Sequence, residues 1–208
     1  MVQKSKQCFS LILVILVAGV VITAKFWLDS RGASLTLNPA HTRAKGNPHA
    51  AIKIEEYIDF QCPACAEGAK LLRIYLEQHP KDLYVQLRFF PLYNMHRHAM
   101  MSTRYAQCAS VQGRFWPFHD LLIDQQQQWE KLADARPVFD SMAQSVGIDI
   151  AKLQKCIEEE KTEDVIVKEQ AEGRKKGVKS TPTYFVDSQM IVGKDALKKF
   201  LDERFSQK

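Results

Sequence analysis

A Cys-Pro-Ala-Cys motif at residues 62–65 lies where a strand-like pattern gives way to a helix-like one, and this junction restricts the fold more than any other feature. In residues 51–60 the apolar side chains occupy the even positions, which predicts a β-strand with one buried face. In residues 64–78 leucines and a tyrosine recur at helical spacing. Pro63 suits the first helical position, because the N–H that it lacks would be unpaired there. The pattern therefore predicts a strand followed directly by a helix, with Cys62 at the helix N-terminus.

This position favours a reactive thiol at Cys62. Unpaired N–H groups and the helix dipole stabilise an anion there, and such cysteines have pKa values of about 3.5–7.5 against about 8.5 for a free thiol. Cys65 is expected one turn further on and less exposed, where it can close a disulfide with Cys62 or resolve a mixed disulfide. Two other interpretations are half of a zinc site, which needs a second pair of ligands, and a structural disulfide, which would constrain little chain.

The rest of the domain predicts a β–α–β unit, a long helical stretch and a β–β–α unit. The expected segments are a strand at 83–90, helices within 96–176, a loop entering a strand at 177–186, a short strand at 189–192 and a terminal helix at 195–205. Pro182 precedes the apolar strand, where a cis bond is possible because X–Pro bonds tolerate cis readily. A trans proline that opens the strand is the alternative.

Four short segments carry a resemblance to a known family: residues 59–65 (DFQCPAC), 112–116 (QGRFW), 118–122 (FHDLL) and 177–183 (GVKSTPT). In this order, and with a helical stretch between them, they resemble the DsbA-like family of thioredoxin-fold thiol–disulfide oxidoreductases over about residues 50–205. The resemblance implies an α/β thioredoxin fold with an inserted α-helical domain. It implies a thioredoxin-fold domain at 51–95 and 177–208 and a helical insertion at 96–176.

The same resemblance assigns roles to further residues. It implies a cis bond between Thr181 and Pro182, which lies against the cysteine pair and binds substrate. It also makes Glu56 look like the buried acid that transfers protons near Cys65. Strand parity independently places Glu56 on the apolar face, and a buried carboxylate has a raised pKa, which suits a proton shuttle. Pairing of Glu56 with a lysine is the alternative.

Some members of the family carry a second, structural disulfide in the insertion, which implies a Cys108–Cys156 bridge in this chain. One residue departs from the family's pattern: its strong oxidants have a histidine between the proline and the second cysteine, and this chain has Ala64. Without that partner the thiolate is less stabilised, and a less stabilised thiolate makes the disulfide less oxidising. The direction of the reaction therefore stays open between oxidase and isomerase or reductase.

Residues 1–28 have the pattern of an export or anchoring segment. Lys4 and Lys6 precede seventeen uncharged residues at 8–24, as in a signal peptide or an uncleaved signal-anchor. Because a small-x-small cleavage site is poor, we expect anchoring in the cytoplasmic membrane through residues 8–28, followed by a tether at 29–50. A cleaved signal peptide is the alternative. Either places the domain in the periplasm or another extracytoplasmic compartment, where disulfides persist.

Charge is concentrated outside the expected domain. The net charge of +5 comes from residues 1–50, with six basic residues and one acid, whereas residues 51–208 hold 23 of each sign. A nucleic-acid partner is therefore not expected, because it would need a basic stripe on the folded body. We interpret His96, His98 and His119 as surface or hydrogen-bonded helix histidines, and residues 125–128 as the solvated end of a helix.

These observations predict a thiol–disulfide oxidoreductase that acts on cysteines of exported proteins, with disulfide formation by Cys62 and Cys65 as the first hypothesis. A disulfide isomerase or reductase is the alternative. A further one is a non-catalytic tethered chaperone or a copper-binding module that uses both thiols as a soft-metal clip. The expected partners are cysteine-containing exported proteins and a membrane redox partner that resets the pair. No cofactor and no metal site are expected.

Overall fold

The computed structural model describes residues 42–206. The expected signal or anchor segment at 1–28 lies outside the described residues, as does most of the expected tether. The described elements are, in chain order, β1 (Ala44–Gly46), β2 (Ile52–Ile58), α3 (Pro63–Gln78), β3 (Leu83–Phe89), α4 (Ala99–Val111), α5 (Phe115–Asp124), α6 (Gln126–Trp129), α7 (Arg136–Ser145), α8 (Ile150–Glu158), α9 (Glu160–Lys175), β4 (Thr183–Val186), β5 (Gln189–Val192) and α10 (Lys194–Ser206). Within residues 42–206, no helix combines the length and the apolarity needed to cross a membrane.

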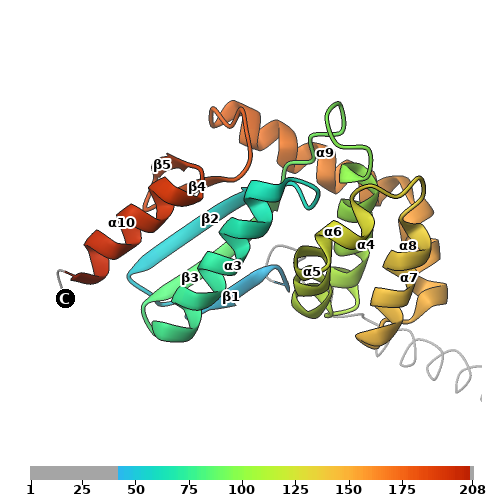
Figure 1. Cartoon of the computed structure of the whole chain (residues 1–208), viewed down its shortest axis with the longest axis horizontal. Coiled ribbons are helices and arrows are strands. Elements are labelled where there is room, and N and C mark those ends of the chain that lie inside the picture. Colours follow the sequence, from blue (N-terminus) through green and yellow to red (C-terminus); the bar gives the residue numbers. More distant parts are fainter. Residues whose placement is uncertain (1–41, 207–208) are drawn as a thin grey trace, which may run out of the picture. The chain divides into compact units, whose positions relative to one another are not determined.

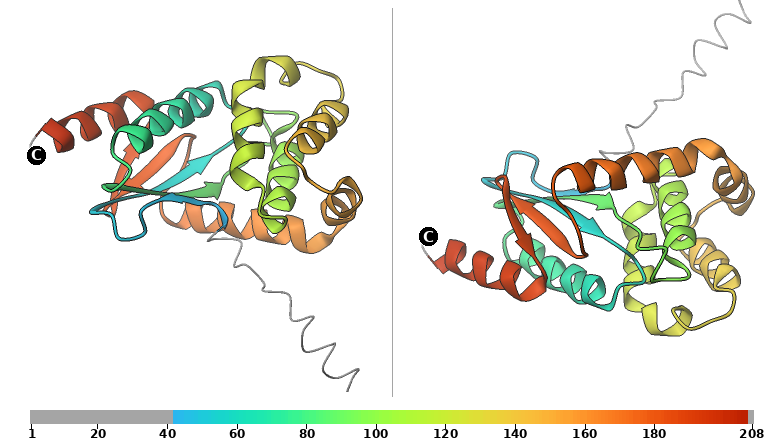
Figure 2. Two further views of the ribbon diagram at one scale, coloured as in Figure 1. Left: turned by 90° about the horizontal axis from the view of Figure 1, so that it is seen from below. Right: turned by 90° about the horizontal axis from the view of Figure 1, so that it is seen from above.

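The five strands form one mixed sheet in the order β1-β3-β2-β4-β5 (Figure 1). β2 and β3 run parallel and are joined through α3, whereas the other three pairings are antiparallel. Helices α3 and α10 cover one face of the sheet and α9 crosses the other (Figure 2). This is the α/β thioredoxin-like arrangement that the sequence predicts, and the fold class is confirmed.

Alternation along the central strands explains how the sheet is held between these layers. Leu83, Val85, Leu87 and Phe89 of β3 are all buried, and the residues between them are half-buried. Leu72 and Tyr75 of α3 pack in the same core as the first part of β2. Burial of apolar side chains of this size stabilises a fold by roughly 1.5–3 kcal/mol each, so this layer holds α3 against the sheet.

Helices α4 to α8 and the first part of α9 form a bundle between β3 and β4 in the sequence (Figure 1). Its centre is aromatic: Phe139 lies edge to face with both Tyr105 and Trp129, with ring centroids 5.2 and 5.1 Å apart. The same core continues through buried residues at the end of β2 and the start of α3. A disulfide joins Cys108 of α4 to Cys156 of α8.

The structure differs from the sequence-based expectation at residues 42–50, the end of the expected tether. β1 pairs antiparallel with β3 there. The Arg43 side chain is 1% exposed and forms a two-bond ion pair with Glu169 of α9, at 2.6 and 2.7 Å. Glu169 also accepts the N–H of Phe89 at 3.0 Å. A three-residue edge strand is too short to show alternation, and the partner of Arg43 lies 126 residues away, so a sequence pattern does not reveal it.

Candidate active site

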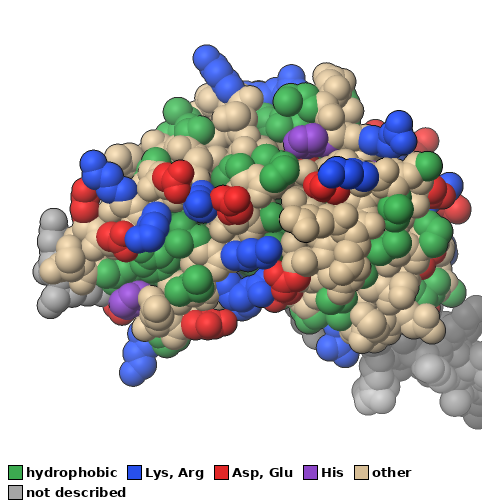
Figure 3. All heavy atoms as spheres, viewed as in Figure 1, with side chains coloured by type: hydrophobic (Ala, Val, Ile, Leu, Met, Phe, Trp, Pro, Cys, Tyr) green, Lys and Arg blue, Asp and Glu red, His purple; other side chains and the backbone are tan. Residues whose placement is uncertain are grey.

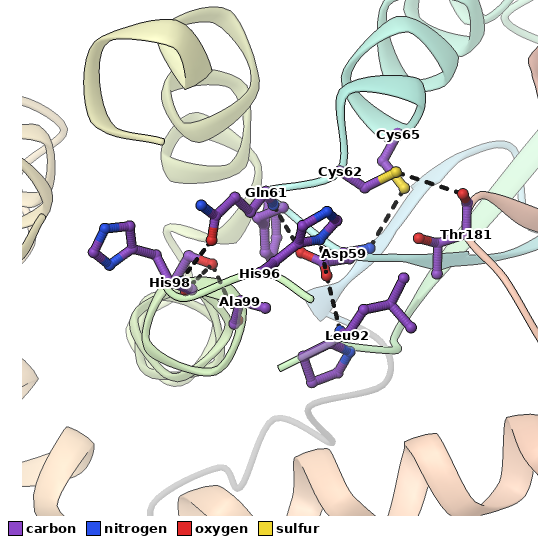
Figure 4. A network of polar contacts seen from close by, with 12 residues as sticks. Asp59, Gln61, Cys62, Cys65, Leu92, His96, His98, Ala99 and Thr181 are labelled. Atoms are coloured by element: carbon purple, nitrogen blue, oxygen red, sulfur yellow. Dashed lines mark hydrogen bonds and ion pairs between the residues drawn. The ribbon is translucent and has the colours of Figure 1, made fainter. Parts of the chain in front are cut away.

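Cys62 is the N-cap residue of α3, and Pro63 occupies the first turn. The backbone of Cys62 is extended, with φ −74° and ψ 120°, and the helix has no acidic residue in its first turn. The positive end of the helix dipole is therefore not offset by a neighbouring carboxylate. Cys62 is 9% exposed, Cys65 is fully buried, and both are free thiols. Figure 4 shows the two sulfur atoms side by side.

The pKa values of the two thiols move in opposite directions. A hydrogen bond from the Cys65 side chain is the main cause that lowers the pKa of Cys62 from 9.0 to about 6, and the backbone N–H groups of Cys65 and Ala64 add to it. Burial is the main cause that raises the pKa of Cys65 well above 9.0, and the neighbouring Cys62 adds to it. The lowered pKa favours the thiolate form of Cys62 at neutral pH, and the raised pKa keeps Cys65 a thiol.

The loop that precedes β4 lies against this pair. The Thr181–Pro182 peptide bond is cis. In its protonated form the Cys62 thiol donates a hydrogen bond to the backbone carbonyl of Thr181, with a distance of 3.5 Å between sulfur and oxygen (Figure 4). Within residues 42–206, the buried Thr181 Oγ1 has no hydrogen-bond partner. The structure thus brings Thr181 to Cys62 from 119 residues away.

Asp59, buried directly after β2, connects the inner cysteine to a loop on the other side. Its backbone N–H donates to Cys65 Sγ at 3.5 Å. Its Oδ2 accepts the N–H of Leu92 at 2.8 Å and lies 2.8 Å from Nδ1 of His96 (Figure 4). Its Oδ1 accepts the N–H of Gln61 at 2.8 Å. The Asp59 carboxylate therefore links the turn that leads into Cys62 to the loop that follows β3, while the Asp59 backbone N–H contacts Cys65.

Gln61 extends this network towards the helical bundle. Its Oε1 accepts the backbone N–H of His98 at 2.6 Å, and its Nε2 donates to the carbonyl of Glu130 at 2.8 Å. The residue next to the reactive thiol is therefore bound to two separate segments of the bundle. The His96 and His98 rings are hydrogen-bonded, to Asp59 and to the carbonyl of Leu132, but both residues precede α4 and neither is a helix histidine as the sequence suggested.

Gln126 of α6 is a site residue that the sequence did not indicate. It is buried, and its Nε2 donates to the carbonyl oxygens of Phe60 at 2.7 Å and Cys62 at 3.1 Å. The interpretation of residues 125–128 as a solvated helix end is wrong at this position. A glutamine tract carries no pattern that distinguishes its one buried member, because its partners lie 64 and 66 residues away.

Glu56 lies in the middle of β2, in register with Leu87 on one side and Tyr184 on the other. Its side chain is buried, and burial raises its pKa from 4.5 to about 8. Within residues 42–206, Oε1 of Glu56 has no hydrogen-bond partner and no lysine pairs with the carboxylate. A carboxyl group in this environment is mostly protonated at neutral pH and can give or take a proton without a large change in pH.

Comparisons with known proteins define the class to which this site belongs. Residues 39–203 match a family described as Thioredoxin, and the chain belongs to that family. Its fold is that of DsbA-like thiol–disulfide oxidoreductases. Wolbachia pipientis alpha-DsbA1 superposes with a TM-score of 0.65 at 20% identity, over 77% of this chain and 87% of that one. BdbD from Bacillus subtilis superposes with a TM-score of 0.67 at 17% identity, over 77% and 91%.

A curated relative has a higher sequence identity than these two structures, but the match covers a smaller fraction of that relative's length. The Na(+)/H(+) antiporter NhaA 3 of Salinispora tropica is 27% identical over 151 residues, which make up 73% of this chain and 22% of that protein. The chain thus spans about one fifth of the length of this relative.

Proposed function

We propose that the protein is a thiol–disulfide oxidoreductase in which Cys62 attacks and Cys65 resolves. The opposite pKa shifts of two thiols at the first turn of α3 carry this proposal. The thiolate is the nucleophile in disulfide exchange, and Cys62 is a thiolate at neutral pH. Cys62 is also the only one of the two with exposed surface, so a client can reach it and cannot reach Cys65.

In the oxidising direction the pair begins as a disulfide. A client thiolate attacks Cys62 Sγ, the Cys62–Cys65 bond breaks, and Cys65 leaves as a thiolate that takes a proton. A second client thiolate then attacks the client sulfur of the mixed disulfide, and Cys62 leaves as a stabilised thiolate. The client loses two electrons and gains a disulfide, and the cysteine pair holds both electrons until a membrane redox partner reoxidises it.

Three further residues support this chemistry in the proposal. Glu56, buried and protonated at neutral pH, supplies and removes the proton of Cys65. Thr181 and Pro182 bind the client, because a backbone carbonyl beside Cys62 can pair with an extended peptide as an added strand does. The proposed clients are cysteine-containing proteins, because thiol–disulfide exchange at Cys62 needs a sulfur partner.

Disulfide formation is the direction we propose. Stabilising the Cys62 thiolate stabilises the reduced pair, and this makes the disulfide a stronger oxidant. Ala64 contributes no positive charge to that stabilisation, so the potential is the measurement that separates the directions. A value near about −120 to −180 mV supports oxidation or isomerisation, whereas a value near about −270 mV supports reduction.

We propose an extracytoplasmic location, with residues 8–28 as the anchor or signal. The closed Cys108–Cys156 disulfide supports it, because structural disulfides persist in oxidising compartments. The proposed organisation is a thioredoxin-fold domain at 51–95 and 177–208 with a helical insertion at 96–176.

Catalysis of insulin reduction tests the proposed oxidoreductase function. A protein that binds copper and shows no thiol–disulfide exchange activity would contradict it.

A further inference from the structure

A small cavity lies beneath α3, between the sheet and α5. Glu56 of β2 and His119 of α5 both line it, and its volume is about 20 Å³. Each carries a buried atom, Oε1 of Glu56 and Nε2 of His119, that has no hydrogen-bond partner among residues 42–206. A cavity of roughly 10–15 Å³ holds one water when polar groups are there to bind it. The volume and the two polar atoms therefore suit one water molecule.

The chemistry of the two side chains is complementary. His119 Nδ1 lies 2.9 Å from Asp120 Oδ1, so its proton is assigned to Nδ1 and Nε2 is left as an acceptor. Burial is the main cause that lowers the pKa of His119, so the ring is neutral at pH 7. Burial holds Glu56 in its protonated form, which offers an O–H donor. A water between them can accept from Glu56 and donate to His119.

We propose that one water bridges Glu56 and His119, and that this bridge carries the proton of Cys65 between Glu56 and solvent. The proposal rests on the proposed function, because it gives His119 a part in the same exchange reaction. Its inner end is the carboxyl group of Glu56, and its outer end is the imidazole of His119 with Asp120.

The outer end of the path reaches the surface. Asp120 is partly exposed and lies 3.4 Å from the Arg73 guanidinium of α3. Lys45 of β1 and Arg73 line the same cavity. Basic and acidic side chains lie next to one another over the junction of α3 and α5 (Figure 3). A proton that reaches His119 therefore has a polar exit, and the two cations help to keep the resting imidazole neutral.

Tyr184 is the titratable group that faces Glu56 from β4. It is the cross-strand neighbour of Glu56, and charges on Glu56, Cys65 and Cys62 add to the burial that raises its pKa. Its hydroxyl has no hydrogen-bond partner within residues 42–206. The hydroxyl is therefore within electrostatic reach of both the inner thiol and the buried acid, and it stays protonated throughout.

Protons and electrons balance when a mixed disulfide on Cys62 is resolved. The Cys65 thiol loses its proton to the ionised fraction of Glu56, and its sulfur attacks Cys62 Sγ. The Cys62–Cys65 bond forms, the bond to the client sulfur breaks, and the client leaves as a thiolate. The proton then passes through the bridging water to Nε2 of His119, which releases its Nδ1 proton towards Asp120 and solvent.

Rapid mixing of the reduced protein with glutathione disulfide tests this step, because attack by Cys62 depends on concentration and resolution by Cys65 does not. His119→Phe should leave attack unchanged and slow resolution by roughly tenfold or more. It should also change the pH profile of resolution. His119→Gln, whose amide oxygen can bind the water but cannot take up its proton, should be slowed as much as His119→Phe. His79→Phe, at the far end of α3, is the matched control. Equal slowing of both steps, or of neither, would overturn the proposal.

Nitrogen NMR of His119 gives a second readout that needs only the folded wild-type protein and Glu56→Gln. The proposal predicts a neutral Nδ1–H ring whose Nε2 signal shifts when Glu56 titrates near pH 8 and when Glu56 is replaced. An Nε2 signal that is insensitive to both changes contradicts it, even where His119→Phe fails to fold. A wild-type protein in which Cys62 never attacks glutathione disulfide contradicts the proposed function instead.

Discussion

Gln126 Nε2 donates to the carbonyl oxygens of both Phe60 and Cys62, at 2.7 and 3.1 Å, so a side chain of the helical bundle holds the peptide that carries the reactive thiol. The contact spans two parts of the chain that the sequence separates by more than sixty residues. The helical bundle thus forms direct hydrogen bonds to the backbone between β2 and α3.

Replacement of Gln126 by leucine should remove the side-chain donor of the buried Phe60 carbonyl, whereas the Cys62 carbonyl keeps the N–H groups of Cys65 and Ala66. An unsatisfied buried polar group costs about 1–3 kcal/mol, so the free energy of unfolding should fall by at least that much in urea titrations. Gln127→Leu, on the exposed side of the same tract, is the matched control and should change stability little. Equal stability of the two variants would show that the Gln126 contacts contribute nothing.

The reactivity of Cys62 towards iodoacetamide should follow its thiolate. Because the pKa is lowered to about 6, the alkylation rate should be near its plateau at pH 7.5 and fall through a midpoint near pH 6 as the pH is lowered. Cys65, buried and with a raised pKa, should remain unmodified throughout. A midpoint near pH 8.5, the value of a free thiol, would mean that the helix terminus does not stabilise the anion.

Glu56→Gln should stabilise the protein in a pH-dependent way. The folded-state pKa of about 8 lies above the ordinary 4.5, so the contribution of Glu56 to stability is fully present below pH 4.5 and is lost as the pH rises to about 8. At pH 7 the gain should be on the order of 3 kcal/mol, and it should vanish near pH 4. Glu77→Gln, on the exposed face of α3, is the control. If Glu56→Gln raises the free energy of unfolding equally at pH 7 and pH 4, burial of the ionised carboxylate is not the cause of the gain.

Glu169→Gln should destabilise the fold strongly. The change removes the carboxylate that pairs with Arg43 at 2.6 Å and with Arg88 at 3.3 Å, and removing one member of a buried ion pair costs about 3–5 kcal/mol. Asp164→Asn, an exposed acid-to-amide change on the same helix, is the control and should be close to neutral. Thermal unfolding of both variants gives the comparison, and matching melting temperatures would mean that β1 is not held by this pair.

The sequence predicts the parts of the fold that repeat and misses the parts that depend on single distant contacts. The alternation in β2 and the helical spacing in α3 are visible because several neighbouring residues share one buried face. Arg43, Asp59 and Gln126 have no such pattern: each is a lone polar residue whose partners come from another element. These side chains hold the structure together because they are buried beside their partners. That burial arises only once distant segments have packed, so no local sequence pattern shows it.

Trapping of mixed disulfides tests the central claim most directly. Cys65→Ser cannot resolve, so exposure to an oxidised client or to glutathione disulfide should accumulate an adduct on Cys62, visible by mass. Cys62→Ser should form no adduct, because the remaining Cys65 thiol is buried and protonated. Adducts on Cys62→Ser and none on Cys65→Ser would contradict the assignment of the attacking and resolving cysteines.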